Sequence, residues 1–317
     1  KFRISGPGAL DLLQYLAVSN IDKPIGKIIY TQFLNSRGGI EADLTISRTG
    51  EEEFYIVTGS AFGVHDRSWI EKHSPRDGSV VIDDLTEEFG VINLCGPHAR
   101  DVLQNVTDDD ISNETLPFSS YTDIRVAGHP VRAMRIGYVG ELGWEMHMGR
   151  ENMPAVYRAL AEAGSQYDIA DVGYRAIDSL RMEKGYLYWS SDISPDYNPF
   201  EAGLGFRVNM KKGDFIGRDA LIAIMENGGP ERKIAYFTLE KYMPVYGSEP
   251  IMREGRILDV TTSANFGYTI GKPLVFGYLP VQEFENRNFS VEAFGEVVPA
   301  TRHDGPLYDP EMKKLKL

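Results

Sequence analysis

The side chains that could carry out chemistry in this sequence are carboxylates set among aromatic residues, because the common catalytic and cofactor motifs are absent. The chain has no glycine-rich dinucleotide fingerprint, no phosphate-binding P-loop, no Gly-x-Ser-x-Gly elbow and no paired-histidine helix motif. Its 6 histidines are scattered without ligand spacing, so we predict no metal site. The single cysteine, Cys95, lies in the strand-like run VINLCGP, which predicts a small buried side chain rather than a nucleophile.

Two carboxylates stand out by their surroundings. Asp43 lies in NSRGGIEADLTI, after paired glycines, and Glu141 lies in YVGELGWEMHM, between aromatic residues. A positioned carboxylate can remove a proton, stabilise a passing cation, or accept two parallel hydrogen bonds. From the residues alone, the more ordinary role of Asp43 is to end a strand and cap a turn. Glu145 competes with Glu141, because strand alternation would turn both side chains to one face.

Alternating strands and helices must position these carboxylates. Apolar alternation around the paired glycines predicts a hairpin over 28–48, followed by a third strand at 53–59. A segment rich in Pro, Gly and Asp predicts a long ordered loop over 192–217. Helical periodicity predicts helices over 6–17, 63–73, 97–106, 151–166, 171–186 and 217–228, and most of the remaining apolar runs before residue 230 are strand-like.

Two segments resemble each other. GPGALDLLQYL at 6–16 and GPHARDVLQNV at 96–106 share Gly-Pro, a helical leucine pattern and Leu-Gln near the end. The pair indicates either an internal duplication of a strand–helix unit or the common Gly-Pro junction between a strand and a helix. Beyond residue 230, short strands at regular spacing predict a small all-β unit, so we divide the chain into 1–230 and 231–317.

The composition of the chain limits the classes of partner that we expect it to bind. The 317 residues exceed what one core usually organises, and 46 acidic against 33 basic residues give a net charge of -13. This sign argues against nucleic acid, and an anionic ligand would need a local basic patch. No run is long and apolar enough to span a bilayer, so we predict no membrane partner and a reducing compartment, the cytoplasm or, in a eukaryote, the mitochondrial matrix. The start at Lys1 without a leader suggests that further residues precede it.

Several motifs occur together in a familiar order. NSRGGIEADLTI, YVGELGWEMHM, YRAIDSLRMEKGY, NPFEAGLGF, KKGDFIGRDAL, TTSANFGYTIGKPLVFGYLPV and PLYDP follow one another along the chain. In order and spacing they resemble the T-protein superfamily of folate-dependent aminomethyltransferases, over essentially the whole sequence. The versions GGIEADLT, GYRAIDSLRMEKG and PLYDP look more like the folate-binding halves of dimethylglycine and sarcosine dehydrogenases than like free T-protein.

The resemblance implies an α+β, three-domain, cloverleaf-like fold with tetrahydrofolate in a central hole. Residues 1–230 would form the folate-binding core of two interleaved subdomains, and 231–317 a small C-terminal β-barrel. The family's catalytic aspartate, which approaches the reactive folate nitrogens, corresponds to Asp43. Condensing an iminium carbon with two nitrogens requires proton removal and stabilisation of a cation, and both are tasks for a carboxylate.

The family's glutamate that binds the pterin ring corresponds to Glu141, which could accept parallel hydrogen bonds from the ring's N–H groups. Trp144 and Trp189 could offer flat surfaces nearby, although each could equally belong to the core. On this basis the predicted cofactor-binding residues are Glu141, Tyr138, Thr45, Arg175 and Trp189.

One departure concerns the central helix. Free T-proteins usually carry an arginine immediately before Asp-Ser-Leu-Arg, whereas this chain has Ile177, with arginines at Arg175 and Arg181. The departure argues against an aminomethyl group arriving on a lipoyl carrier and favours another donor route. The anionic glutamate tail of folate would need basic partners. The densest basic cluster in the sequence is formed by Lys211, Lys212 and Arg218, although such runs usually belong to solvated loops.

The resemblance therefore implies a tetrahydrofolate-binding one-carbon transferase. It would capture a formaldehyde-level or iminium-level unit from a methylated amine of the dimethylglycine or sarcosine type and give 5,10-methylenetetrahydrofolate. The oxidation needs FAD, and no flavin fingerprint occurs here, so the flavin is expected upstream of Lys1 or on a partner dehydrogenase domain or subunit. Two alternatives stay open: direct methyl transfer from an onium or methylated amine donor, and a non-catalytic regulatory subunit with this fold.

Overall fold

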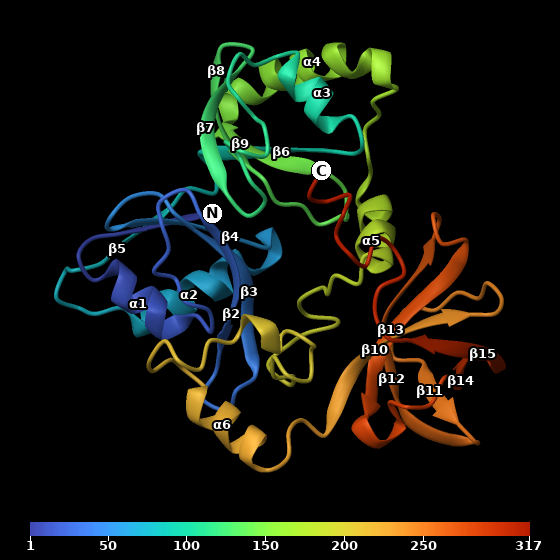
Figure 1. Cartoon of the computed structure of the whole chain (residues 1–317). Coiled ribbons are helices and arrows are strands. Elements are labelled where there is room, and N and C mark those ends of the chain that lie inside the picture. The colour runs from blue at the N-terminus through green and yellow to red at the C-terminus, as the bar shows by residue number, and fades with distance from the viewer.

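The computed structural model describes residues 1–317 and folds them into three lobes, each built on its own sheet (Figure 1). The last sheet closes into a barrel, and the first two carry helices. The predicted α+β, cloverleaf-like fold ending in a barrel is therefore confirmed. None of the helices combines the length and the apolar composition that crossing a bilayer requires.

The first lobe is an antiparallel sheet with two helices packed on it. Its elements are β1 (Phe2–Ser5), α1 (Ala9–Leu16), β2 (Ile28–Leu34), β3 (Ile40–Arg48), β4 (Glu53–Thr58), η1 (Ser60–Phe62), α2 (Gly63–His73) and β5 (Val81–Asp84). The strand order is β2-β3-β4-β1-β5. Apolar residues at helical spacing in α1, among them Leu12 and Leu16, share one core with alternating strand residues such as Ile4 and Ile46.

The second lobe repeats the strand–helix opening of the first. Its elements are β6 (Phe89–Cys95), α3 (Ala99–Gln104), β7 (Tyr121–Val126), β8 (His129–Met134), β9 (Gly143–Gly149), η2 (Arg150–Asn152), α4 (Met153–Gly164) and η3 (Ser165–Tyr167), with strand order β6-β9-β8-β7. In both lobes a glycine of positive φ turns the first strand into the helix: Gly6 at 109° and Gly96 at 127°. The two similar segments of the sequence thus occupy equivalent places.

The chain then returns to the first lobe before it enters the barrel. Helix α5 (Tyr174–Glu183) lies between the second lobe and the barrel, and a long loop with the single turn η4 (Gly205–Arg207) leads to α6 (Arg218–Glu226) on the first lobe (Figure 1). The loop is ordered by backbone hydrogen bonds, for example from Ile40 N–H to the Tyr197 carbonyl at 2.9 Å. The 192–217 loop predicted from the sequence is present.

The third lobe is a closed barrel in the order β10-β13-β12-β11-β14-β15. Its elements are β10 (Arg232–Leu239), β11 (Pro250–Arg253), β12 (Arg256–Gly267), β13 (Lys272–Pro280), η5 (Val281–Glu283), β14 (Asn288–Ala293) and β15 (Glu296–His303). Inward residues such as Phe289 and Val291 alternate with less buried ones along β14. Closure leaves no unpaired sheet edge.

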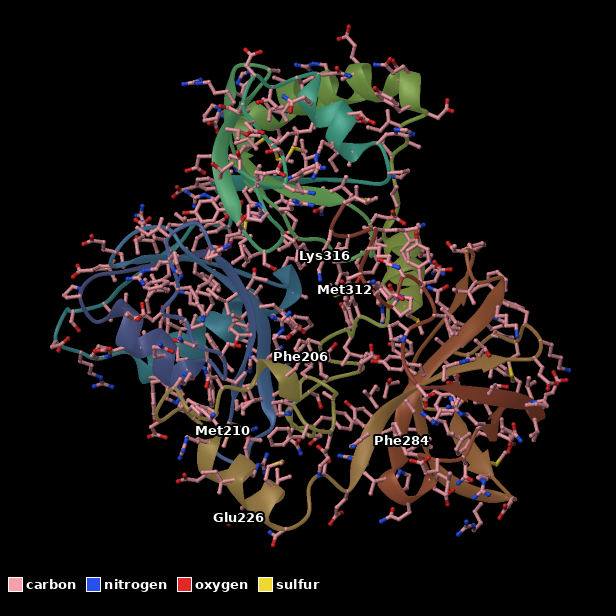
Figure 2. The ribbon with its side chains drawn as sticks, viewed as in Figure 1. Phe206, Met210, Glu226, Phe284, Met312 and Lys316 are labelled. Atoms are coloured by element: carbon pink, nitrogen blue, oxygen red, sulfur yellow. The ribbon has the colours of Figure 1, made fainter.

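The residues after β15 run back between the barrel and the second lobe, where Met312 and Lys316 lie (Figure 2). Lys184 forms a buried ion pair with Asp309 at 3.3 Å, and Tyr308 N–H donates to the Glu183 carbonyl at 3.1 Å. The Leu317 carbonyl accepts hydrogen bonds from two arginines of the second lobe, Arg100 and Arg135. This tail therefore joins α5 to the second lobe.

Two local expectations are wrong. Cys95 is exposed rather than buried, because β6 is an edge strand whose Leu94 faces the helices while Cys95 points to the opposite, open side. Glu141 precedes β9 and lies in a loop, so strand alternation does not relate it to Glu145.

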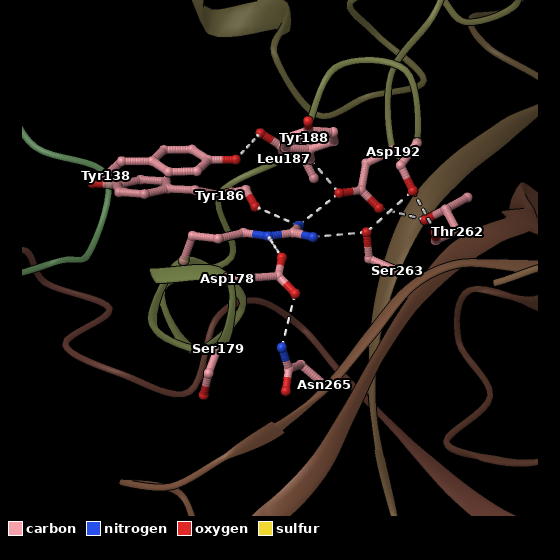
Figure 3. Close-up of polar contacts among 12 residues, drawn as sticks. Tyr138, Asp178, Ser179, Tyr186, Leu187, Tyr188, Asp192, Thr262, Ser263 and Asn265 are labelled. Carbon is pink, nitrogen blue, oxygen red and sulfur yellow. Dashed lines mark hydrogen bonds and ion pairs between the residues drawn. The ribbon is translucent and has the colours of Figure 1, made fainter. Parts of the chain in front are cut away.

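A buried arginine holds α5, the returning loop and the barrel together (Figure 3). The Arg181 guanidinium donates to Asp178 at 2.8 Å, to Asp192 at 2.7 Å and to the Ser263 hydroxyl at 2.8 Å. It also donates to the Tyr186 carbonyl at 3.0 Å. Asp192 is fully buried, so each charge compensates the other where water does not reach.

Replacing Arg181 by methionine should lower the free energy of unfolding by about 3–5 kcal/mol, because it leaves the buried Asp192 carboxylate unpaired. Urea unfolding measures this. The matched control is Arg3→Met, which breaks the exposed pair with Asp83 and should cost less than about 1 kcal/mol. Equal losses in the two variants would contradict the structural role given to Arg181.

Candidate functional site

Asp43 lies on the face of β3 that does not join the core of the first lobe. Alternation buries Ala42 and Leu44 and leaves Asp43 and Thr45 partly exposed on the other face. The hairpin register places Gln32 of β2 directly opposite Asp43, and the Gln32 side-chain amide donates to the carboxylate at 2.7 Å. Gln32 is fully buried, so the carboxyl group is held by a rigid neighbour.

The environment of Asp43 makes it a weak acid suited to proton transfer. Burial raises the pKa of Asp43 to about 6, although hydrogen bonds from Gln32 and Tyr30 favour its ionised form. The nearby Asp66 carboxylate raises this pKa further, and the Arg207 charge lowers it. A carboxylate with a pKa near 6 is mostly ionised at pH 7 and can take up and return a proton.

Two tyrosines form a flat wall next to Asp43. The rings of Tyr138 and Tyr186 are stacked with centroids 5.9 Å apart and planes 12° apart, and the Tyr138 hydroxyl donates to the Leu187 carbonyl at 2.7 Å (Figure 3). Burial raises the pKa of Tyr138, and the charge of Asp43 contributes to this rise. The hydroxyl of Tyr138 is thus within electrostatic reach of the Asp43 carboxylate.

Glu141 lies three residues after Tyr138 in the loop before β9. Its Oε1 accepts a hydrogen bond from the Tyr308 hydroxyl of the C-terminal tail, and Lys314 Nζ is 3.8 Å from the same oxygen. No protein group hydrogen-bonds to Oε2, so that oxygen can accept from a ligand. Glu145 turns elsewhere, toward His147 Nε2 at 3.3 Å. The structure therefore distinguishes Glu141 from Glu145, which the sequence alone could not do.

The other predicted residues differ in their surroundings. Thr45 shares the face of Asp43 and pairs with Tyr30 across the hairpin. Trp189 packs its half-buried ring edge-to-face on Phe62, with centroids 4.5 Å apart. Arg175 is exposed at the start of α5, without a hydrogen bond or ion pair to the cluster around Asp43.

Two further candidates have structural partners. Trp144 is 1% exposed and lies in the core of the second lobe, so it belongs to the core rather than to the tyrosine wall. In the basic cluster, Lys212 donates to the Gln14 carbonyl, and Arg218 donates to the Met210 carbonyl at 3.5 Å. Burial lowers the pKa of Lys212 to about 8. Lys211 is the member of this cluster that remains solvated.

Sequence reasoning missed four residues of this region. Tyr30 and Gln32 could have been found from the hairpin register, which pairs them with Thr45 and Asp43. Tyr308 belongs to PLYDP, a motif to which no role was assigned. Arg207, whose guanidinium lies over the Tyr30 ring at 5.2 Å, comes from the long loop and carried no sequence signal.

Comparison with known families gives two adjacent matches. The GCVT N-terminal domain matches residues 1–212, and the glycine cleavage T-protein C-terminal barrel domain matches residues 232–309. The second match covers all of the barrel strands, and the first covers both α+β lobes and most of the returning loop. Together they confirm the resemblance predicted from the sequence.

Individual proteins agree with the family matches. Mitochondrial sarcosine dehydrogenase of Mus musculus is 37% identical over 339 residues, and mitochondrial dimethylglycine dehydrogenase of the same species is 37% identical over 320 residues. Both comparisons cover 100% of this chain but 37% of the relative, so this chain spans little more than a third of their length. The crystal structure of glycine cleavage system aminomethyltransferase T from Bartonella henselae has a TM-score of 0.86 and 26% identity, covering 98% of this chain and 84% of that one.

The raised pKa of Asp43 predicts a specific dependence of stability on pH. The folded protein holds this proton up to about pH 6, whereas the unfolded chain releases it near the ordinary value of 3.8. Stability associated with the protonated carboxyl is thus present at low pH and lost as pH rises toward 6. Asp43→Asn should abolish this loss and raise the free energy of unfolding at pH 7 by up to about 3 kcal/mol.

Urea unfolding of both proteins at several values between pH 4 and pH 7 measures the effect. Other titrating groups cancel in the difference between wild type and Asp43→Asn. If the two curves run parallel over this range, Asp43 titrates at its ordinary value and the desolvated site is not formed.

Proposed function

Because the chain belongs to the glycine-cleavage T-protein family of aminomethyltransferases, we propose that it binds tetrahydrofolate and transfers to it a one-carbon unit from an N-methylated amine. The donor would be of the dimethylglycine or sarcosine type, the substrates named in two relatives, and the product 5,10-methylenetetrahydrofolate. The observation that carries this proposal is the desolvated Asp43 carboxylate, with its pKa near 6, beside the stacked Tyr138 and Tyr186 rings.

Asp43 is assigned the proton transfers. Tetrahydrofolate supplies the two nucleophilic nitrogens that hold the carbon. Asp43 Oδ would accept the proton that a folate nitrogen loses when it bonds to the iminium carbon, and would return a proton to the departing amine. In the overall reaction, an iminium cation and two folate N–H groups give the methylene bridge, a neutral amine and one released proton. Gln32 fixes the carboxylate during both transfers.

Glu141 and the tyrosine wall are assigned the recognition of the ring. Glu141 has a free Oε2, and Oε1 keeps a second lone pair beside the Tyr308 hydroxyl, so the carboxylate can accept two parallel N–H bonds. The faces of Tyr138 and Tyr186 suit a flat reduced pteridine. Lys314 Nζ, 3.8 Å from Glu141 Oε1, adds a positive charge beside the carboxylate.

The oxidation that generates the donor is assigned outside residues 1–317. These residues carry no dinucleotide fingerprint that could bind FAD, whereas two relatives are dehydrogenases of which this chain spans 37%. We therefore propose that a flavin dehydrogenase domain or subunit supplies the iminium or formaldehyde. The mitochondrial names of these relatives are compatible with the reducing compartment expected for this chain.

Calorimetry with tetrahydrofolate under reducing conditions tests the proposal directly. We expect the intact chain to bind, and Glu141→Gln to weaken binding about tenfold or more, because an amide cannot accept two parallel N–H bonds. The matched control is Glu145→Gln, a carboxylate of the same loop–strand segment that faces His147, with an expected change below about twofold. A folded wild-type sample that binds no tetrahydrofolate defeats the proposal.

A second test concerns the tail. Tyr308→Phe removes the donor that orients Glu141, so tetrahydrofolate affinity should fall about threefold to tenfold. In the Glu141→Gln background the same change should have little further effect, since the two residues act through one contact. The exposed Tyr246 serves as control, and Tyr246→Phe should leave affinity unchanged. Additive losses in the double variant would separate Tyr308 from Glu141.

Product analysis distinguishes the chemistry. With the parent dehydrogenase and an electron acceptor present, mass spectrometry should find methylenetetrahydrofolate. A methyl-bearing folate formed without an electron acceptor would instead indicate direct methyl transfer. Asp43→Asn should lower the rate by at least about a hundredfold, and an unchanged rate would indicate a non-catalytic subunit.

A further inference from the structure

One charged side chain at the candidate site has no partner. The Arg207 guanidinium forms no hydrogen bond and no ion pair within the chain, although the residue is half-buried. Its Nε is fully enclosed without an acceptor, whereas its two terminal nitrogens, which also lack an acceptor, are not fully enclosed. Every other arginine that is buried or half-buried donates at least one guanidinium hydrogen bond, as Arg181 and Arg302 do.

Arg207 is nevertheless held in place. Its carbonyl accepts from the Ser19 hydroxyl at 2.9 Å, and its N–H donates to the Leu204 carbonyl at 2.9 Å. The guanidinium lies 5.2 Å from the Tyr30 ring centroid and 4.8 Å from that of the exposed Phe206, whose position in the turn is labelled in Figure 2. The faces of aromatic rings attract and orient the guanidinium. They do not accept the hydrogen bonds that its N–H groups donate in the plane of the guanidinium.

The neighbours of Arg207 are the residues of the candidate site. Burial lowers the pKa of Arg207, and the charges of Tyr30, Tyr186 and Asp43 act in the opposite direction. Asp43 does not pair with Arg207, because its Oδ1 is bonded to Gln32 and no oxygen comes within ion-pair distance. The N–H groups of the Arg207 guanidinium are thus free to bind a ligand in the region where Asp43 would transfer protons.

The negative net charge of the protein indicates what kind of ligand the unpaired Arg207 cation would bind. The chain carries a net charge of -13, and Asp43 and Asp66 add local negative charge, so a carboxylate would be repelled unless a cation received it. Lys212 and Arg218 are occupied by backbone carbonyls. A guanidinium fork matches a carboxylate with two parallel N–H bonds.

We propose that Arg207 binds a ligand carboxylate whose reacting end lies at Asp43. The inference rests on the proposed function and extends it to substrate recognition. Two ligands of that reaction carry such a group: the iminium of the methylated amino acid, next to its reacting carbon and nitrogen, for which dimethylglycine is a stable stand-in, and folate, in its glutamate tail. Arg207 would select an amino acid over a methylated amine without a carboxylate, or folate over a pteroyl amide that lacks the glutamate.

The test compares Arg207→Met with wild type in four calorimetric titrations of the chain. The probes are tetrahydrofolate, tetrahydropteroyl amide, in which a neutral amide replaces the glutamate, dimethylglycine and dimethylethylamine. We expect about a tenfold to hundredfold loss of affinity for one carboxylate ligand and no loss for its counterpart without the carboxylate. Loss with tetrahydrofolate assigns the glutamate tail, and loss with dimethylglycine assigns the donor.

Controls separate folding from binding. Arg207→Lys keeps the charge without the fork and should lose affinity by an intermediate factor. Arg158→Met, an exposed arginine of α4, should change nothing. Because an unpaired charge is removed, Arg207→Met should melt no lower than wild type.

Unchanged affinity of Arg207→Met for all four ligands, while wild type binds tetrahydrofolate, overturns this inference and leaves the proposed function standing. A wild type that fails to bind tetrahydrofolate defeats the proposed function, and the dimethylglycine pair still decides Arg207.

Discussion

The packing of α5, the returning loop and the barrel depends on one desolvated charge cluster, in which the Arg181 guanidinium joins Asp178 of its own helix, Asp192 of the returning loop and Ser263 of the barrel. A buried ion pair adds little net stability, but opening it leaves charges without water or partner, which costs several kcal/mol. Any movement of α5 against the loop or the barrel would open these bonds. The cluster therefore acts as a constraint on geometry, and α5, the loop and the barrel keep one arrangement although they share no continuous sheet.

The same constraint positions the groups that face the centre. The Tyr186 carbonyl accepts from Arg181, and the neighbouring Leu187 carbonyl accepts from the Tyr138 hydroxyl, so the ring wall is built on the loop that the charge cluster holds. At the end of α5, Lys184 fixes Asp309, which places the adjacent Tyr308 against Glu141. The hydrogen bonds that hold α5 and the loop thus also position the residues of the candidate site. Breaking them would displace those residues.

Charges in this protein fall into two groups that differ in how far the chain itself satisfies them. Arg181 has a protein acceptor for each of its three nitrogens, which is what a structural role requires. Asp43 and Arg207 lie in one region, yet neither has an ionic partner within the chain, and Asp43 is desolvated enough to raise its pKa to about 6. Groups that the fold leaves unsatisfied are those that a ligand can complete.

Local pattern determined much of this protein without a structure. Helical spacing, strand alternation and glycine turns predicted the helices, the hairpin that carries Asp43 and the all-β character of the C-terminal lobe, because these signals arise between residues close in the chain. The order of motifs also identified the family. Tertiary structure alone decided that Cys95 is exposed, that Trp144 belongs to the core, that Glu141 meets Tyr308 across 167 residues, and that Arg207 lies unpaired near Asp43. Periodicity tells which face of an element is apolar, but not which distant segment packs on it or whether a charge finds its partner there.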